Sequence, residues 1–130
     1  MNKLAKLFIT FVSAITLALA SISSSFAKVE DGMIVLGAAI SLTGKYSSNG
    51  EHTQNGYNMA VDRINSMGGV KVGGKSYKFE IIYYDDESNP KRAAQLAERL
   101  IKQDGVHYML GPYSSGLTKA IAPVLSLIHI

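Results

Sequence analysis

The residues best suited by type and spacing to hold a small molecule lie between positions 106 and 118. This segment begins as a short apolar run, breaks at Gly111-Pro112, and continues with Ser114 and Ser115. That order is typical of a buried strand that turns sharply into a helix. A helix beginning at Ser114 or Ser115 would present free backbone N–H groups and its positive dipole end beside two hydroxyl groups. This segment, called the serine turn (residues 111–116), suits an anionic or polar end of a ligand.

The serine turn also has a purely structural interpretation, because a serine directly before a helix often caps its first turn. The two roles are compatible, and the local sequence leaves both open. Leu117 stands where a phosphate-binding loop needs lysine, and Pro112 stands where the G-x-S-x-G elbow of serine hydrolases needs its first glycine. A carboxylate or an amide therefore suits the turn better than a polyphosphate does.

Other motifs carry less weight. Gly69–Ser76 matches the phosphate-binding pattern G-x-x-x-x-G-K-[ST], but a helical pattern precedes it and an alternating strand pattern follows, so we reject nucleotide binding. His107 falls within the predicted buried strand, where we interpret it as a packed core histidine, and His52 has no evident partner. Asp85-Asp86-Glu87 lacks the glycine-spaced ligands of a calcium loop, and a solvated turn is the favoured interpretation. We expect no catalytic group, no metal and no cofactor.

The elements that must position the serine turn begin with Met33–Ile40, a continuous apolar run typical of a strand buried on both faces. Residues 41–50 form a long loop by composition, and we favour a ligand-facing role for it over an ordinary surface loop. Residues 51–67 predict a helix, and Gly68-Gly69 predicts its end. Its expected buried stripe has helical spacing and comprises Tyr57, Ala60, Val61, Ile64 and Met67.

The next residues predict a hairpin, with arms at 70–72 and 76–84 and a turn at Gly73-Gly74-Lys75. The alternation in the second arm places that strand toward a sheet edge. Asn89 and Pro90 predict the start of a second helix over 91–103, which Gly105 ends. The alternation of strands and helices predicts an α/β fold with a doubly wound, mostly parallel sheet.

The amino end has the pattern of an export signal. A basic start precedes the apolar run 7–20, and Ser25-Phe26-Ala27 fits a cleavage site, so we expect cleavage after Ala27 rather than an uncleaved anchor. Removal of 1–27 takes away two lysines and no acid, so the net charge falls from +3 to +1. No Lys/Arg cluster remains to favour nucleic acid. The absence of cysteine excludes disulfides and a lipid anchor on cysteine, which favours a soluble periplasmic protein.

Five features in this order resemble a known family. They are the leader, Ser41-Leu42-Thr43-Gly44, the G-Y-N-M-A-V-D-R-I-N helix ending in Gly68-Gly69, the Asp85-Asp86 turn with Pro90, and Gly111-Pro112-Tyr113-Ser114-Ser115. Over residues 34–124 the chain resembles ABC-transporter substrate-binding proteins of the branched-chain amino acid (Leu/Ile/Val) type, which also includes binders of amides and urea. The resemblance implies a type I periplasmic binding protein fold, in which two α/β lobes close on a ligand.

The resemblance also implies site residues. The ligand's carboxylate or amide oxygen would meet Ser115, with Ser114 beside it and Gly116 offering its backbone. Tyr113 matches a pocket aromatic of amide-binding relatives. Asn49 falls at a wall position where branched-chain binders carry an aromatic residue, which argues against Leu/Ile/Val as ligands, and Tyr46 would substitute for that aromatic.

The chain departs from the family in length and at its end. We expect residues 28–124 to form the first part of lobe 1, and we interpret 125–130, which break the family pattern, as a read-through or assembly artefact. The expected function is delivery of an amino acid, amide or urea to an inner-membrane ABC permease by a protein that is a monomer at full length. The alternatives are the sensing domain of a receptor and a secreted α/β enzyme.

Overall fold

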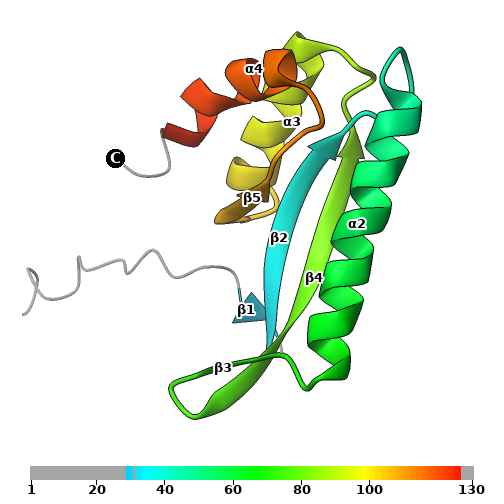
Figure 1. Ribbon diagram of the computed structural model, residues 1–130. Coiled ribbons are helices and arrows are strands. Elements are labelled where there is room, and N and C mark those ends of the chain that lie inside the picture. Colours follow the sequence, from blue (N-terminus) through cyan, green and yellow to red (C-terminus); the bar gives the residue numbers. More distant parts are fainter. Residues whose placement is uncertain (1–28, 31, 127–130) are drawn as a thin grey trace, which may run out of the picture.

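A computed structural model describes residues 29–30 and 32–126 of the chain. Its elements, in chain order, are β1 (Val29–Glu30), β2 (Met33–Ile40), α2 (Ser47–Ser66), β3 (Val70–Val72), β4 (Lys75–Asp85), α3 (Pro90–Lys102), β5 (Tyr108–Leu110) and α4 (Ser115–Ser126) (Figure 1). The expected export signal and residues 127–130 lie outside the described residues. Because α4 continues through Leu125 and Ser126, the expected domain boundary at 124 falls inside a helix and stays a prediction.

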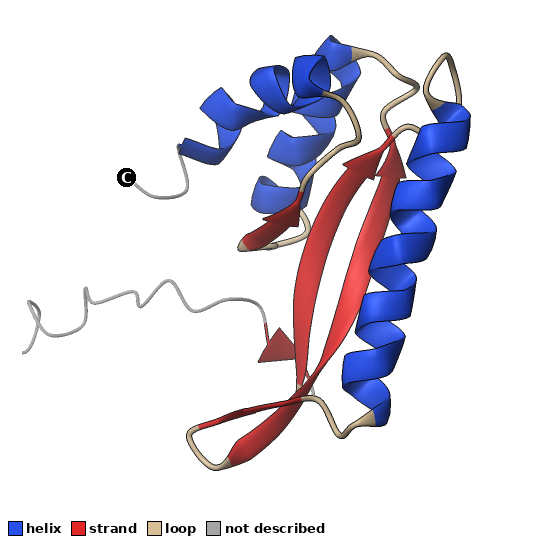
Figure 2. Cartoon of the chain, in the orientation of Figure 1, coloured by secondary structure: helices blue, strands red, loops and turns tan. Residues whose placement is uncertain are grey.

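The sheet is built around β2, which confirms the predicted α/β class. β2 pairs in parallel with β4 on one side and with β5 on the other, and the short β1 runs antiparallel to its first residues. Helix α2 lies on one face of these strands, and α3 and α4 lie on the other (Figures 1 and 2). The arrangement is doubly wound, since α2 leads from β2 to β4 on one side of β2, and α3 then leads from β4 back past β2 to β5 on its other side.

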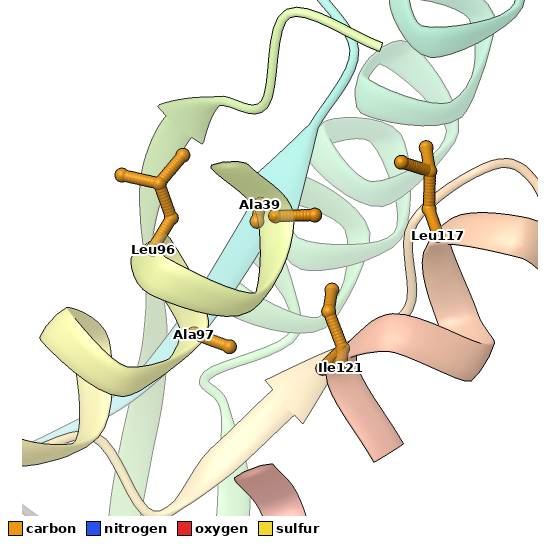
Figure 3. Close-up of a cluster of buried hydrophobic side chains, with 6 residues drawn as sticks. Ala39, Leu96, Ala97, Leu117 and Ile121 are labelled. Atoms are coloured by element: carbon orange, nitrogen blue, oxygen red, sulfur yellow. The ribbon is translucent and has the colours of Figure 1, made fainter. Parts of the chain in front are cut away.

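Small residues in β2 allow α3 and β5 to approach closely. Ala38 and Ala39 are fully buried, and a Cβ added at Gly37 would lie 2.8 Å from the sulfur of Met109. On this face, buried side chains of β2, α3 and α4 form the main core cluster (Figure 3). Its members are Ala39, Ala93, Leu96, Ala97, Leu117 and Ile121. This packing fixes where α4, and therefore the serine turn, can begin.

The predicted hairpin is present as β3 and β4, joined at Gly73 and Gly74, whose φ angles of 58° and 80° suit glycine. The phosphate-loop look-alike therefore forms two strands. Within the described residues, β4 pairs with β2 along one side and with the short β3 only near its start on the other side. This confirms the prediction that β4 lies toward an edge of the sheet. The side chain of Asn65 in α2 covers part of this edge, because it both donates to the carbonyl and accepts from the N–H of Phe79, at 2.8 Å each.

The sequence placed α3 well. Asn89 caps the helix, since its Oδ1 accepts from the N–H groups of Lys91 and Arg92. The following strand begins later than predicted, at Tyr108. The N–H of Val106 instead donates to Leu100 O at 2.9 Å and closes the turn after α3. The prediction that His107 lies in a buried strand is therefore wrong. His107 is half-buried and precedes β5.

Two expectations about the first helix were wrong. Helix α2 begins at Ser47 rather than at 51, and its stripe is less covered than predicted, because Ala60 and Met67 are exposed and Tyr57, Val61 and Ile64 are half-buried. The fully buried residue of α2 is Gly50, which lies against the carbonyl of Ser41. The amino end of the helix is therefore packed directly against the residue that follows β2.

Two glycines of α2 provide a matched test of this contact. A Cβ at Gly50 would lie 1.9 Å from Ser41 O, whereas one at Gly56 meets nothing within 4 Å. Gly56→Ala should raise the free energy of unfolding by about 0.5–1 kcal/mol through helix propensity. Gly50→Ala should lower it by about 1–3 kcal/mol through overpacking. Urea denaturation measures both, and equal stabilisation by the two variants would contradict the close approach.

Candidate functional site

The carboxyl ends of β2, β4 and β5 meet at one edge of the sheet because the three strands are parallel. Three connections leave from this edge: the first loop (residues 41–46), the acidic turn (residues 85–89) and the serine turn (Figure 1). In open α/β sheets, this edge is where ligands bind. The predicted site residues all lie on these connections or in the first turn of the helices that follow.

The serine turn divides its roles between its two serines. Ser114 caps α4, because its Oγ accepts from Leu117 N at 3.2 Å and its carbonyl accepts from Thr118 N at 2.9 Å. Ser115 is the first residue of α4, and Ser115 and Gly116 are both exposed. The first N–H groups of a helix have no acceptor within it. Residues 115 and 116 therefore offer an exposed hydroxyl group and backbone N–H groups at the start of a helix.

The first loop is shorter than predicted, which changes the setting of Asn49. Ser47 N donates to Gly44 O and Gly50 N donates to Tyr46 O, so residues 47–50 close the first helical turn. Asn49 is thus an exposed residue of that turn rather than a loop residue. Sequence composition missed this because Ser, Asn and Gly favour loops until tertiary contacts, here with Ser41, hold them in a helix.

Two predicted site residues from distant connections do come together. The rings of Tyr46 and Tyr113 lie 5.8 Å apart between centroids with 54° between their planes, a favourable tilted aromatic geometry. The ammonium group of Lys45 lies 4.6 Å from the centroid of the Tyr46 ring. Tyr46 packs against the main core cluster, whereas Tyr113 is 47% exposed. The pair joins the first loop to the serine turn.

Asp85 fixes the first loop to the acidic turn. Its Oδ1 accepts from the backbone N–H groups of Leu42, Thr43 and Glu87, and its Oδ2 accepts from the Thr43 hydroxyl at 2.7 Å. Partial burial acts to raise the pKa of Asp85, but these hydrogen bonds together outweigh it. The pKa of Asp85 therefore lies below its ordinary value of 3.8, and the carboxylate stays ionised at neutral pH.

Asp86 and Ser88 complete this contact. Asp86 Oδ1 accepts from Ser41 Oγ at 2.6 Å and from Ser88 N at 2.8 Å. Ser88 Oγ donates to Thr43 O and accepts from Tyr46 N. We call these bonds, with those of Asp85, the loop–turn network. Glu87 and Ser88 have φ angles of 55° and 59°, an unfavourable left-handed conformation for residues other than glycine, which the network holds in place.

The network corrects the interpretation of Asp85-Asp86-Glu87 as a solvated turn. Asp86 is fully buried, and in the described part of the chain its Oδ2 has no hydrogen-bond partner. Two acidic residues at the carboxyl end of a parallel strand were the sequence signal for a positioning role, since this edge faces the site. Among the described residues, no group of His, Asp and Glu side chains is arranged to hold a metal ion.

Within residues 29–30 and 32–126, no helix has the length and apolar character needed to cross a bilayer.

Comparisons with known proteins identify relatives of this chain. A family described as periplasmic binding protein matches residues 33–129. A Leu/Ile/Val-binding protein of Rhizobium johnstonii is 32% identical over 104 residues, which are 80% of this chain and 27% of that protein. The Leu/Ile/Val-binding protein of Escherichia coli K12 is 31% identical over 101 residues, 78% of this chain and 26% of that protein. The chain thus spans about a quarter of the length of these curated relatives.

A solved structure gives the same fold. The branched-chain amino acid transporter substrate-binding protein LivJ of Streptococcus pneumoniae, in complex with isoleucine, superposes with a TM-score of 0.67 at 30% sequence identity. The match covers 75% of this chain and 27% of that one. The edge where the carboxyl ends of β2, β4 and β5 meet, which we call the crevice edge, is therefore part of a type I periplasmic binding protein fold.

The lowered pKa of Asp85 makes a prediction about acid stability. Because the folded pKa lies below the unfolded one, the ionised group favours the fold above about pH 3.8, and this contribution is lost as pH falls through the folded pKa. Asp85→Asn should therefore be less stable than the parent at neutral pH, with the difference shrinking below pH 3.8. Urea unfolding at a series of pH values measures it.

Asp62→Asn is the control for this experiment, because Asp62 is an exposed carboxylate on α2 away from the loop–turn network. If the Asp85→Asn difference stayed constant down to pH 2.5, the hydrogen bonds would not be acting through the ionised form of Asp85.

Proposed function

Since this chain belongs to the periplasmic binding protein family, which matches residues 33–129, we propose that it is part of an exported solute-binding protein. The whole protein would capture an amino acid or amide and deliver it to an inner-membrane ABC permease. The family assignment confirms the resemblance to the Leu/Ile/Val type that the sequence indicated. The family binds solutes and does no chemistry on them, and the mechanism that fits is capture followed by closure of two lobes.

The observation that carries this proposal is the exposed start of α4. Ser115 is exposed at the crevice edge. Because Ser114 caps the helix, the hydroxyl group of Ser115 is not used as the cap. A carboxylate or amide oxygen placed there would accept from the Ser115 hydroxyl and from the N–H of Gly116, and the helix dipole would favour negative charge. Such a ligand needs no metal and no cofactor to be held.

The Tyr46–Tyr113 pair supports a ligand whose other end is flat or apolar. The exposed ring of Tyr113 belongs to the serine turn itself, and Tyr46 contacts it from the core side. Asn49, exposed in the first turn of α2, would add a polar group to the wall of the site. An amide or an amino acid fits this set of groups. The names of two curated relatives, both Leu/Ile/Val-binding proteins, give branched-chain amino acids as the alternative ligands.

The proposal predicts a ligand with a carboxylate or amide group. In a thermal-shift panel on the complete protein, a binding amino acid, amide or urea should raise the melting temperature as its concentration increases. Sugars and phosphate esters serve as controls and should leave it unchanged. A shift with phosphate esters alone would contradict the proposed use of the serine turn.

Replacement of one hydroxyl tests the site. Ser115→Ala should weaken binding of the ligand found in the panel by about 5- to 150-fold, the value of one buried hydrogen bond to a charged or polar group. Ser66→Ala, which removes an exposed hydroxyl at the far end of α2, is the control and should bind normally. Isothermal titration calorimetry gives both affinities, and an unchanged affinity for Ser115→Ala would refute the assignment.

The proposed closure needs a second lobe. Sequencing the gene from intact source DNA should find an open frame that runs past codon 124 into a second α/β lobe. A stop codon directly after Ile130 would exclude capture between two lobes by this chain.

A further inference from the structure

We propose that Tyr57 is a positioning residue whose hydroxyl group fixes the serine turn by holding the backbone carbonyl of Gly111. This inference rests on the proposed function, because the serine turn is there assigned to the ligand. It goes further in naming a residue outside the crevice edge, in the middle of α2, on which the geometry of that turn depends.

The contact joins two distant parts of the chain. The Tyr57 hydroxyl donates to the carbonyl oxygen of Gly111 at 2.9 Å, across 54 residues of sequence. Tyr57 is half-buried, and this burial raises the pKa of its hydroxyl group above the ordinary value of 10.0. The group therefore stays protonated at physiological pH and remains a hydrogen-bond donor throughout that range.

The serine turn has few other restraints where Tyr57 meets it. Among the hydrogen bonds of the described residues, the bond from Tyr57 is the one that reaches residues 111–113. Gly111 is exposed and a Cβ there would meet nothing within 4 Å, so packing does not restrict it. Because glycine has wide conformational freedom, a bond to its carbonyl removes more freedom here than at most positions. The ring contact of Tyr113 with Tyr46 restrains the side chain further along.

The contact also ties two walls of the proposed site to one helix. Asn49 lies in the first turn of α2, and Tyr57 lies eight residues further along the same helix, about 12 Å at 1.5 Å per residue. The amino end of α2 is fixed by Gly50 against Ser41, and its middle is fixed to the serine turn by Tyr57. Asn49 and Ser115 are thus held at a set separation by a rigid element.

A second tyrosine provides a matched control. The hydroxyl of Tyr83, also half-buried, donates to Oδ1 of Asn58 at 2.8 Å, so it binds the same helix without reaching the serine turn. Tyr57→Phe and Tyr83→Phe each keep the aromatic ring and remove one hydrogen bond. Any general loosening of α2 should therefore be common to both variants.

The experiment measures hydrogen–deuterium exchange of the complete protein without ligand, followed by ligand affinity. Tyr57→Phe should speed exchange in peptides covering 110–118, while Tyr83→Phe should leave those peptides at the parent rate. With the ligand from the thermal-shift panel, Tyr57→Phe should weaken binding by about 2- to 12-fold, the value of one neutral hydrogen bond. Tyr83→Phe should bind as the parent does.

Each outcome decides a different claim. Parent-like exchange over 110–118 in Tyr57→Phe, or equal acceleration in both variants, would overturn the positioning role of Tyr57. Faster exchange with unchanged affinity would uphold that role and overturn the assignment of the serine turn to the ligand. If no compound in the panel binds, the proposed function fails, and the exchange measurement still decides the role of Tyr57.

Discussion

The crevice edge depends on one constraint: two side chains of the acidic turn, Asp85 and Ser88, must satisfy the backbone of the loop that leaves β2. The first loop runs from a fully buried strand end at Ile40 and has few apolar side chains of its own to anchor it. Asp85 supplies acceptors for two of its N–H groups, and Ser88 binds both the Thr43 carbonyl and the Tyr46 N–H. Buried or partly buried backbone groups must find such partners. The loop can therefore hold Tyr46 in place without secondary structure.

The network is also costly, which indicates that it serves more than stability. Asp86 is fully buried with one oxygen unpartnered in the described part of the chain, and two consecutive residues adopt left-handed backbone angles. Each feature is unfavourable alone. Both lie beside the segment that carries Tyr46, and strain of this kind gathers where a rigid, preorganised surface is needed. In a binding protein, a preorganised wall lowers the entropy lost when the ligand is captured.

Much of the fold could be predicted because the signals were local. Asn89-Pro90 marked the start of α3, and paired glycines marked the hairpin, through hydrogen bonds and backbone angles that involve neighbouring residues. Errors arose where a distant contact decided. Asn49 lies in a helix rather than in the predicted loop, and the contact of Gly50 with Ser41 that holds it there is not visible in the sequence. Val106 is an exception with a local cause, because its N–H donates to Leu100 O, six residues earlier, at the end of α3. For the site, the sequence selected the serine turn and Tyr46 but missed Asp85, Ser88 and Tyr57 as residues that position them.

The sequence by itself determined the class of protein and the chemistry at the start of α4. Strand and helix periodicity and the turn residues predicted an α/β fold, the order of motifs indicated the family, and Ser114-Ser115 placed hydroxyl groups at a helix start. The tertiary structure decided the contacts of each side chain: Ser114 caps the helix, Ser115 is exposed, and the ring of Tyr46 packs against that of Tyr113. The physical reason is that local patterns specify which backbone shape a segment prefers, whereas the partner of a side chain depends on the register of β2 with β4 and β5 and on the packing of the helices against them.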